Sequence, residues 1–177
     1  LKSQPATSVE VSVGSSLSLP YHNGLSTSAS MEDFTIVDAN DDGSTWSFDG
    51  NYNMVAYTAN SSNAADDWFI TPPINMQKGA AYKFSFDAVN DYPTERVAAA
   101  IGTDATAEAM TDIVIEPTEV TYQPRRRTLS GTFRATEDGM RYFGIHAISD
   151  ADCNHLYVDN LNITEVSASA PDSPTVL

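Results

Sequence analysis

The sequence contains one cysteine, Cys153, in 177 residues, so no internal disulfide can form. It also lacks the paired Cys and His spacings that are typical of zinc sites. Basic residues are scarce, since 9 Lys and Arg stand against 24 Asp and Glu, which gives a formal net charge of −15. Such a field repels nucleic acid and anionic membranes and favours cations. We therefore expect no nucleic-acid partner.

Long apolar runs, helical periodicity and catalytic motifs are absent or rare as well. No run of 18 apolar residues occurs, so no segment is expected to insert directly into a membrane. Only residues 106–113 (TAEAMTDI) follow a helical pattern, and they would form about two turns. Neither a G-x-S-x-G nor an H-E-x-x-H motif is present. These absences argue against a helical fold and against common hydrolase classes.

Alternation of apolar and polar residues dominates the chain instead. In residues 82–89 (YKFSFDAV), aromatic side chains occupy every second position from Tyr82 to Phe86, which is typical of a half-buried antiparallel strand. Ten segments read as strands in this way: residues 9–13, 34–37, 53–59, 68–72, 82–89, 95–102, 111–122, 128–135, 140–149 and 155–166. Such strands, joined by Gly, Asn, Asp and Pro turns, predict an all-β fold. We expect a two-sheet antiparallel β-sandwich of jelly-roll type, with a closed up-and-down barrel as the alternative.

The length suits one domain with a single core. Residues on the apolar side of the alternation should form that core, among them Trp68, Ile70, Phe84, Phe86, Ile145 and Val158. We expect residues 20–166 to make up the domain. The Ser-rich residues 1–19 should be a linker or an edge strand from a preceding region, and the Ser, Ala and Pro of residues 167–177 should link to a following module.

The segment DANDDGSTW (residues 38–46) carries side-chain oxygens at alternate positions. Asp38, Asn40 and Asp42 are followed by Gly43, and Asp49 stands where an EF-hand loop has its last ligand. Because the flanking residues predict strands, we expect no helical EF-hand but a calcium-binding loop between strands. The alternative is a turn in which Asp and Asn side chains bond their own backbone.

Other charged residues lie beside apolar strands. Asp66 and Asp67 precede the strand WFITP and are expected in a loop, where they could also meet a metal ion. Asp159 lies inside the apolar segment LYVDNLNI and needs a partner, which calcium or a turn amide would supply. The run PRRR (residues 124–127) is expected to solvate a strand start and block edge pairing; the alternative is that it receives an anionic group.

Catalysis has little support in the sequence. Cleavage of a glycoside would need paired carboxylates, for which Glu95, Glu116 and Glu119 are available in this acid-rich chain. Cys153 and His155 would share a strand face, but the sequence indicates no third residue to orient them. We therefore expect the chain not to be an enzyme.

The segments DFTIVDANDDGSTW, DDWFITPPI and LYVDNLNI, in this order and spacing, resemble those of a known family. From about residue 20 to 166, the chain is similar to the cleaved-adhesin, or choice-of-anchor J, domain, which is related to the adhesin modules that follow the protease in gingipains. The resemblance implies a calcium-bearing jelly-roll β-sandwich, similar to MAM and carbohydrate-binding modules. It also implies one unit of a larger exported protein of Bacteroidetes.

The resemblance also implies positions for calcium. Asp38, Asn40 and Asp42 match the acidic turn of the family, and Asp159 matches an acid of its late strand. Relatives commonly have an acid in their first strand, whereas this chain has His22 in the stretch LPYHNG. If that acid is a ligand in the family, the site at Asp159 is weakened or lost here, while the turn is unaffected.

Together, the residues and the resemblance predict a non-catalytic adhesion or binding module that is stabilised by calcium. We expect it at the cell surface or outside the cell. Its expected partners are an extracellular protein or a glycan, and the neighbouring domains of the same polypeptide. A glycan-active enzyme of jelly-roll fold and a purely structural spacer are the alternatives.

Overall fold

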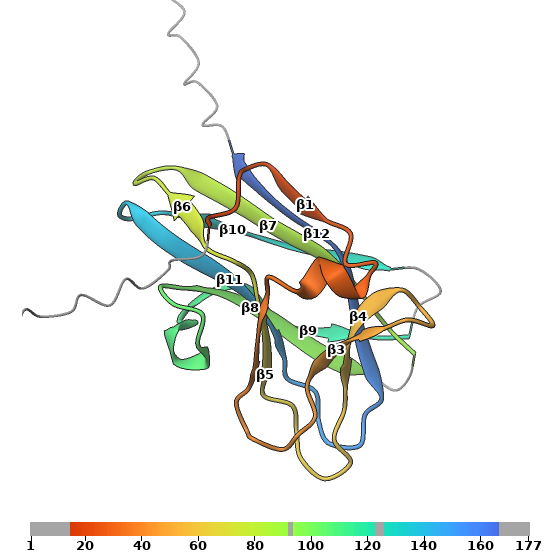
Figure 1. The fold of residues 1–177 in the computed structure, drawn as a ribbon. Helices are drawn as coiled ribbons and strands as arrows, with labels where there is room; N and C mark the ends of the chain where they lie inside the picture. The colour runs from red at the N-terminus through yellow and green to blue at the C-terminus, as the bar shows by residue number, and fades with distance from the viewer. Residues whose placement is uncertain (1–14, 92–93, 123–125, 167–177) are drawn as a thin grey trace, which may run out of the picture.

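The computed structural model describes residues 15–91, 94–122 and 126–166 (Figure 1). The strand expected at residues 9–13, and most of both expected linkers, lie outside the described residues, so the domain limits stay a prediction. No helix of the described part is long and apolar enough to cross a membrane.

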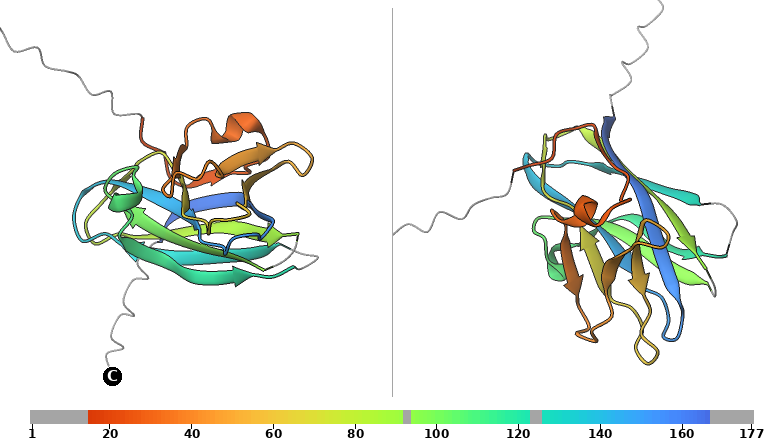
Figure 2. Two further views of the ribbon diagram at one scale, coloured as in Figure 1. Left: turned by 90° about the horizontal axis from the view of Figure 1, so that it is seen from below. Right: turned by 45° about the vertical axis from the view of Figure 1, so that its right-hand side comes forward.

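Two antiparallel sheets of six strands each pack face to face (Figure 2). Sheet A has the order β10-β7-β12-β4-β3, with β1 paired to β12. Its strands are β1 (Tyr21–Asn23), β3 (Trp46–Asp49), β4 (Met54–Thr58), β7 (Ala81–Asn90), β10 (Arg127–Arg134) and β12 (His155–Val166). Sheet B has the order β2-β5-β11-β8-β9, with β6 paired to β11. Its strands are β2 (Thr35–Asp38), β5 (Asp67–Ile70), β6 (Ile74–Met76), β8 (Glu95–Gly102), β9 (Asp112–Val120) and β11 (Gly139–Ala147).

The predicted all-β sandwich is therefore confirmed, and the alternation of β7 shows why it forms. Phe84 and Phe86 point into the sandwich and are fully buried, while Lys83, on the opposite face of the strand, is exposed. Across the sheet, Phe86 pairs with Leu129 of β10, and Phe84 pairs with Ile163 of β12. Because a shift by one residue would turn the whole aromatic row to solvent, this pattern fixes the register of the central strands.

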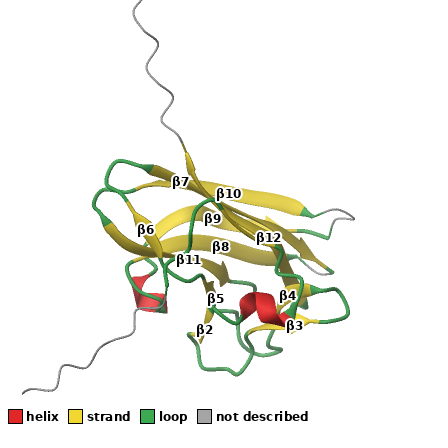
Figure 3. Ribbon diagram, turned by 45° about the horizontal axis from the view of Figure 1, so that its top comes forward, coloured by secondary structure: helices red, strands yellow, loops and turns green. Residues whose placement is uncertain are grey.

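One predicted element was wrong. Residues 106–113 do not form two helical turns; they contain the single 3₁₀ turn η2 (Ala107–Ala109), after which β9 begins at Asp112. The helical spacing of TAEAMTDI reflects one turn that folds Met110 over sheet B, where this side chain is buried against Trp68. The only other helix of the described residues is the 3₁₀ helix η1 (Ser28–Met31) (Figure 3).

The main core lies between the sheets, and aromatic rings dominate it. Phe84 stacks on Phe143 with ring centroids 4.7 Å apart, and Phe34 stacks on Phe69 at 4.3 Å. All six residues predicted for the core are buried: Trp68, Ile70, Phe84, Phe86, Ile145 and Val158. Trp68 and Ile70, however, belong to a second cluster, on the outer face of sheet B beneath the η2 turn. Strand β5 is buried on both faces, which is why its alternation carries little information.

Three loops gather at one end of the sandwich, at the bottom of Figure 1: residues 39–45, 59–66 and 148–154. Backbone hydrogen bonds tie them together, from Ala39 N to Asp66 O, from Ala65 N to Ser149 O and from Asp152 N to Asn60 O. The acidic loop that follows β2 is thus part of a connected structure rather than an isolated turn.

Candidate functional site

The outer face of sheet A, which points away from sheet B, carries a groove lined by tyrosines. Tyr157 of β12 and Val89 of β7 are paired on this face, and Met54 of β4 packs beside them. Tyr52, from the turn between β3 and β4, reaches over this apolar patch. Tyr122, two residues after the end of β9, lines the groove as well.

The groove has a volume of about 400 Å³. Its lining residues are Tyr52, Met54, Val89, Asn90, Asp91, Tyr122 and Tyr157. Tyr52 is 57% exposed and Tyr122 is 64% exposed, and both belong to the small set of large apolar side chains that the described chain leaves open to solvent. Since exposed aromatic rings lose water easily on binding, two of them at one groove indicate a ligand site.

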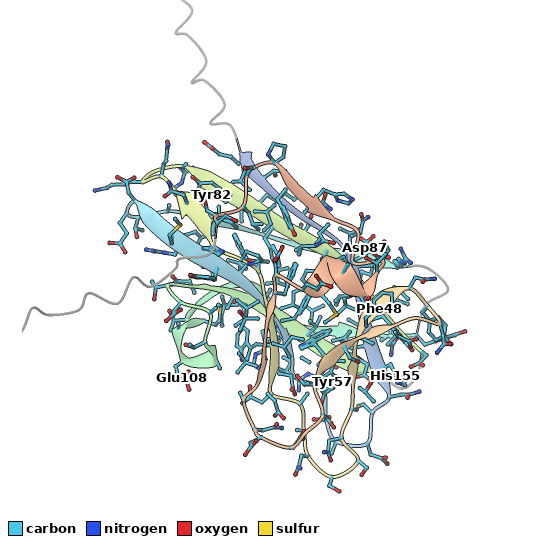
Figure 4. The ribbon with its side chains drawn as sticks, in the orientation of Figure 1. Phe48, Tyr57, Tyr82, Asp87, Glu108 and His155 are labelled. Atoms are coloured by element: carbon cyan, nitrogen blue, oxygen red, sulfur yellow. The ribbon has the colours of Figure 1, made fainter. Side chains whose placement is uncertain are left out.

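Aromatic rings contact one another along the groove. The rings of Tyr52 and Tyr157 lie 5.1 Å apart and are tilted by 54°. The imidazole of His155 also stacks nearly parallel to the ring of Tyr157, with centroids 5.6 Å apart. Figure 4 shows His155 at the edge of the sandwich where β12 begins. A planar ligand that enters the groove would therefore meet rings that already contact one another.

Asp91 brings a carboxylate to the same groove. Its Oδ2 lies 3.4 Å from His155 Nδ1 and accepts a long hydrogen bond of 3.5 Å from the hydroxyl of Tyr157. Its Oδ1 is buried and has no hydrogen-bond partner. Burial, followed by the charges of Asp91 and Asp49, raises the pKa of Tyr157, so its hydroxyl stays protonated as a donor.

These groups together suit an uncharged polar ring. Tyrosine faces can cover the apolar face of a sugar, and the side chain of Asp91 adds a polar group to the same lining. The lining includes one acid and no Lys or Arg, so an anionic ligand would be repelled.

Farther along the same face lies Asp159, one of the predicted calcium ligands. It is buried and forms an ion pair with Arg126, and its Oδ1 accepts a hydrogen bond of 2.7 Å from the backbone of Asn160. Asn160 has a φ of 56°, within the bulge of β12. His22 bonds Asn162 at 2.8 Å and supplies no acid. The residues here do not fit a calcium ion, because the guanidinium of Arg126 already supplies the positive charge.

The ion pair of Asp159 involves a residue of the arginine run, residues 124–127. Arg126 meets Asp159, while Arg127 begins β10 and donates from its guanidinium to the carbonyl of Glu119 at 3.1 Å. Arg127 is exposed at this strand start, as the sequence predicts, and the third arginine of the run lies outside the described residues. Arg126 is therefore already paired with an acid of the domain itself, which weakens the alternative that the arginine run receives an anionic ligand.

The acidic loop brings three of the predicted ligands together. The two oxygens of Asp38 accept hydrogen bonds from the backbone of Asp42 at 3.2 Å and of Gly43 at 2.9 Å. Asn40 donates to Asp42 Oδ2 at 3.2 Å and to the carbonyl of Ala64 at 2.7 Å. The side chains thus cap the turn, which was the alternative to a metal loop, and each carboxylate oxygen keeps a second lone pair.

Asp49 is not part of this group. It lies at the other end of β3, paired across the sheet with Met54, and caps the next turn by accepting from Asn51 N at 2.8 Å. The described residues also contain no three His, Cys, Asp or Glu side chains that converge to hold a metal ion as they stand. A calcium ion at the loop would need hydroxyl, amide or carbonyl oxygens besides its carboxylates.

The carboxylates considered for catalysis do not form a pair in a cleft. Glu95 is fully buried and accepts from Asn154 N at 2.8 Å, whereas Glu116 and Glu119 are exposed on β9. Cys153 donates weakly to the carbonyl of Thr94 at 3.5 Å, and burial raises the pKa of its thiol, which disfavours a thiolate nucleophile.

Sequence reasoning missed the groove. Tyr52 and Tyr122 stand in the turn GNYNM and at the end of EVTY, where an aromatic residue interrupts a polar segment. An aromatic residue in such a polar segment was the signal from which an exposed ring could have been predicted. Tyr157 is also a tyrosine, but it is buried. Only the pairing of strands in the structure distinguishes it from the exposed Tyr52 and Tyr122.

Comparisons by sequence find no relative. No protein-family model matches the chain, and no curated protein matches it either. Comparison with solved structures is informative. The structure is similar to the K1 cleaved adhesin domain of Lys-gingipain from Porphyromonas gingivalis, with a TM-score of 0.65 and 16% identity over 85% of this chain and 100% of that one.

Two further solved structures are similar to this one. The K3 cleaved adhesin domain of the same gingipain superposes with a TM-score of 0.61 and 15% identity, over 75% of this chain and 89% of that one. A xylan-binding module of Paenibacillus barcinonensis superposes with a TM-score of 0.57 and 12% identity, over 84% of this chain and 95% of that one. The resemblance to cleaved adhesins is thus confirmed at the level of the fold.

Proposed function

We propose that the domain is a non-catalytic binding module of a larger exported protein, and that the tyrosine groove binds a neutral glycan outside the cell. The observation that carries this proposal is the convergence of Tyr52 and Tyr122, both more than half exposed, on one groove that is also lined by Asp91. The likeness to adhesin and xylan-binding folds supports a binding role.

Removing both exposed rings should abolish most of the affinity. For Tyr52→Ala combined with Tyr122→Ala, we expect a loss of about 2 kcal/mol, roughly 30-fold in Kd, because buried tyrosines often dominate binding energy. Titration calorimetry against a panel of soluble neutral polysaccharides, with xylan included, measures this. A panel of matrix proteins run in parallel tests the other class of extracellular partner.

Two variants serve as controls. Tyr52→Phe keeps the ring and should keep the binding, while Ile113→Ala removes an exposed apolar side chain from the outer face of sheet B and should change nothing. Full binding by the double alanine variant would contradict the assignment of the groove. Release of reducing sugar from any polysaccharide would favour the glycan-active enzyme instead.

Calcium at the acidic loop is the second part of the proposal. Asp38, Asn40 and Asp42 lie within one turn, and the carboxylates of Asp38 and Asp42 repel each other without a cation. We expect the domain to melt at a higher temperature in calcium than in chelator, with a gain of about 2.7 kcal/mol at a hundredfold excess over Kd.

The same melts should be repeated with Asp38→Ala and Asp42→Ala, which should reduce the calcium response. Identical melting of the unmodified domain in millimolar calcium and in chelator would mean that the loop is only a capped turn. An undiminished response in both variants would place the ion elsewhere.

A further inference from the structure

The outer face of sheet B carries a hollow, on the side of the sandwich opposite the tyrosine groove. Small residues form its floor. Ala98 lies in one row with His146 and Trp68 across three neighbouring strands, and Ala100 follows two residues later on β8. Because residues that lie opposite each other in an antiparallel ladder share a face, both alanines face outward. We call this hollow the alanine pocket; its volume is about 280 Å³.

Larger side chains form the walls of the alanine pocket. On one side, the rings of Trp68 and His146 stack with their centroids 3.9 Å apart. On the other side, Ile113 of β9 is 59% exposed, although it is a large apolar residue. Gly144 of β11 makes room for the first wall, since a Cβ atom there would lie 2.8 Å from the ring of Trp68. Glycine and alanine in the middle strands, between large residues on the outer ones, thus leave a space that no side chain of the lining fills.

The size and polarity of the pocket restrict what it can hold. Its volume lies just below the roughly 300–1,000 Å³ of pockets for small-molecule ligands. Its lining is Ala, Ile, Met, Pro, Trp and one His, and Nε2 of that His146 already lies 2.7 Å from Asp66 Oδ1. The hydroxyl groups of a sugar would find few partners here, whereas one apolar side chain would leave water for apolar walls. Pockets of this kind receive the anchor side chain of a protein partner.

The segment that forms one wall is acidic. Residues 103–122 contain five Asp or Glu and no Lys or Arg. Three of these acids, Glu108, Asp112 and Glu116, are exposed and stand within two residues of a side chain that lines the pocket (Figure 4 labels Glu108). None of the three forms an ion pair within the part of the chain that the structure describes. An apolar pocket beside unneutralised carboxylates is complementary to an apolar side chain that is flanked by Lys or Arg.

Charge argues against a second copy of this chain as the occupant. A second copy would bring another formal net charge of −15 toward these acids. On the sheet itself, Arg96 of β8 lies opposite Glu119 of β9, so this base is matched by an acid of the same face. The surface therefore favours a partner with positive charge.

We propose that the alanine pocket is a protein-docking site, which takes one apolar side chain from a basic segment of an extracellular protein. Glu108, Asp112 and Glu116 pair with the Lys or Arg residues on either side of that anchor. The domain would then bind a glycan on the outer face of sheet A and a protein on the outer face of sheet B. This inference goes beyond the proposed function and does not depend on it, because the two sites lie on opposite faces of the sandwich.

The test uses the 177-residue chain and labelled synthetic peptides, whose binding is followed by fluorescence anisotropy. A peptide with one phenylalanine between two pairs of lysines should bind at least tenfold more tightly than the same peptide with serine in place of the phenylalanine. Glutamates in place of the lysines should abolish binding. Raising the salt concentration from about 50 mM to about 500 mM should weaken binding severalfold, since exposed charges are screened.

Variants of the pocket separate docking from simple attraction between opposite charges. Ala98→Leu fills the hollow and should lower the affinity for the phenylalanine peptide at least tenfold. Ile113→Ser removes an exposed part of the wall, so it should lower the affinity severalfold and leave the melting temperature unchanged, whether or not Ala98→Leu folds. Asp112→Asn combined with Glu116→Gln should lower the affinity and reduce its salt dependence. Ile36→Ser is the matched control, because it makes the same change at a 38% exposed isoleucine of β2 outside the pocket and should leave binding unchanged.

Three results would overturn the inference. The first is the absence of binding by the phenylalanine peptide, and the second is equal binding by the serine peptide, which would leave only charge attraction. The third is unchanged affinity of Ile113→Ser together with folded Ala98→Leu. Dimerisation of the chain that Ala98→Leu abolishes would assign the pocket to a second copy instead. Glycan binding at the tyrosine groove should be the same in Ile113→Ser and in the unmodified chain, so each site can fail without the other.

Discussion

Replacing Phe86 by alanine should lower the free energy of unfolding by about 3–5 kcal/mol, the usual cost of emptying a fully enclosed aromatic site. Phe86 is 0% exposed and lies in the middle of β7, the strand that pairs with both β10 and β12. Its ring is 5.7 Å from that of Phe84, so a cavity here would open beside the most densely aromatic part of the core. Urea unfolding, followed through the fluorescence of the buried Trp46, measures the change.

Tyr52→Ala provides the control for this prediction. It also removes one aromatic ring, but from a side chain that is more than half exposed, so its cost in stability should stay within about 0.5 kcal/mol. A loss below about 1 kcal/mol for Phe86→Ala would mean that the ring is not enclosed and that the register of β7 differs from the one described.

Much of the fold could be predicted from alternation because most strands are buried on one face only. The segment 155–166 was predicted with the bounds that β12 has, and 95–102 with those of β8. The missed strands, β1, β3 and β6, have only three or four residues, too few for a period of two to be recognised. Residues 106–113 were wrongly predicted as a helix because the segment is short, and a single turn followed by the start of a strand can imitate helical spacing.

The candidate sites were less predictable because they depend on contacts between distant segments. Asp159 was expected to need a partner, and that physical argument holds: it pairs with Arg126, which directly precedes β10, and accepts a hydrogen bond from the backbone of Asn160. Asp67 was expected in a loop, whereas it begins a strand and is fully buried. A sequence shows how many acids a loop carries, but not which of them the fold removes from water.

The two sheets also meet at an edge, where β10 of sheet A crosses β9 of sheet B, and a glycine makes this crossing possible. A Cβ atom placed on Gly131 would lie 1.8 Å from the carbonyl oxygen of Val114 and 3.2 Å from the side chain of Ile115. The obstacle is backbone, so no rotamer change relieves it. Gly131 does not need a left-handed conformation, and the restriction is purely one of space.

Gly131→Ala should therefore destabilise the domain by about 3 kcal/mol, at the upper end of the cost of overpacking, because β9 and β10 must separate to admit one methyl group. Gly50→Ala is the matched control: its nearest neighbour would be a ring atom of Phe48 at 3.9 Å, so we expect a change within about 0.5 kcal/mol. Urea unfolding of both variants gives the comparison, and hydrogen exchange should show lost protection first in β9 and β10. Equal stability of the two variants would show that the sheets do not approach each other at Gly131.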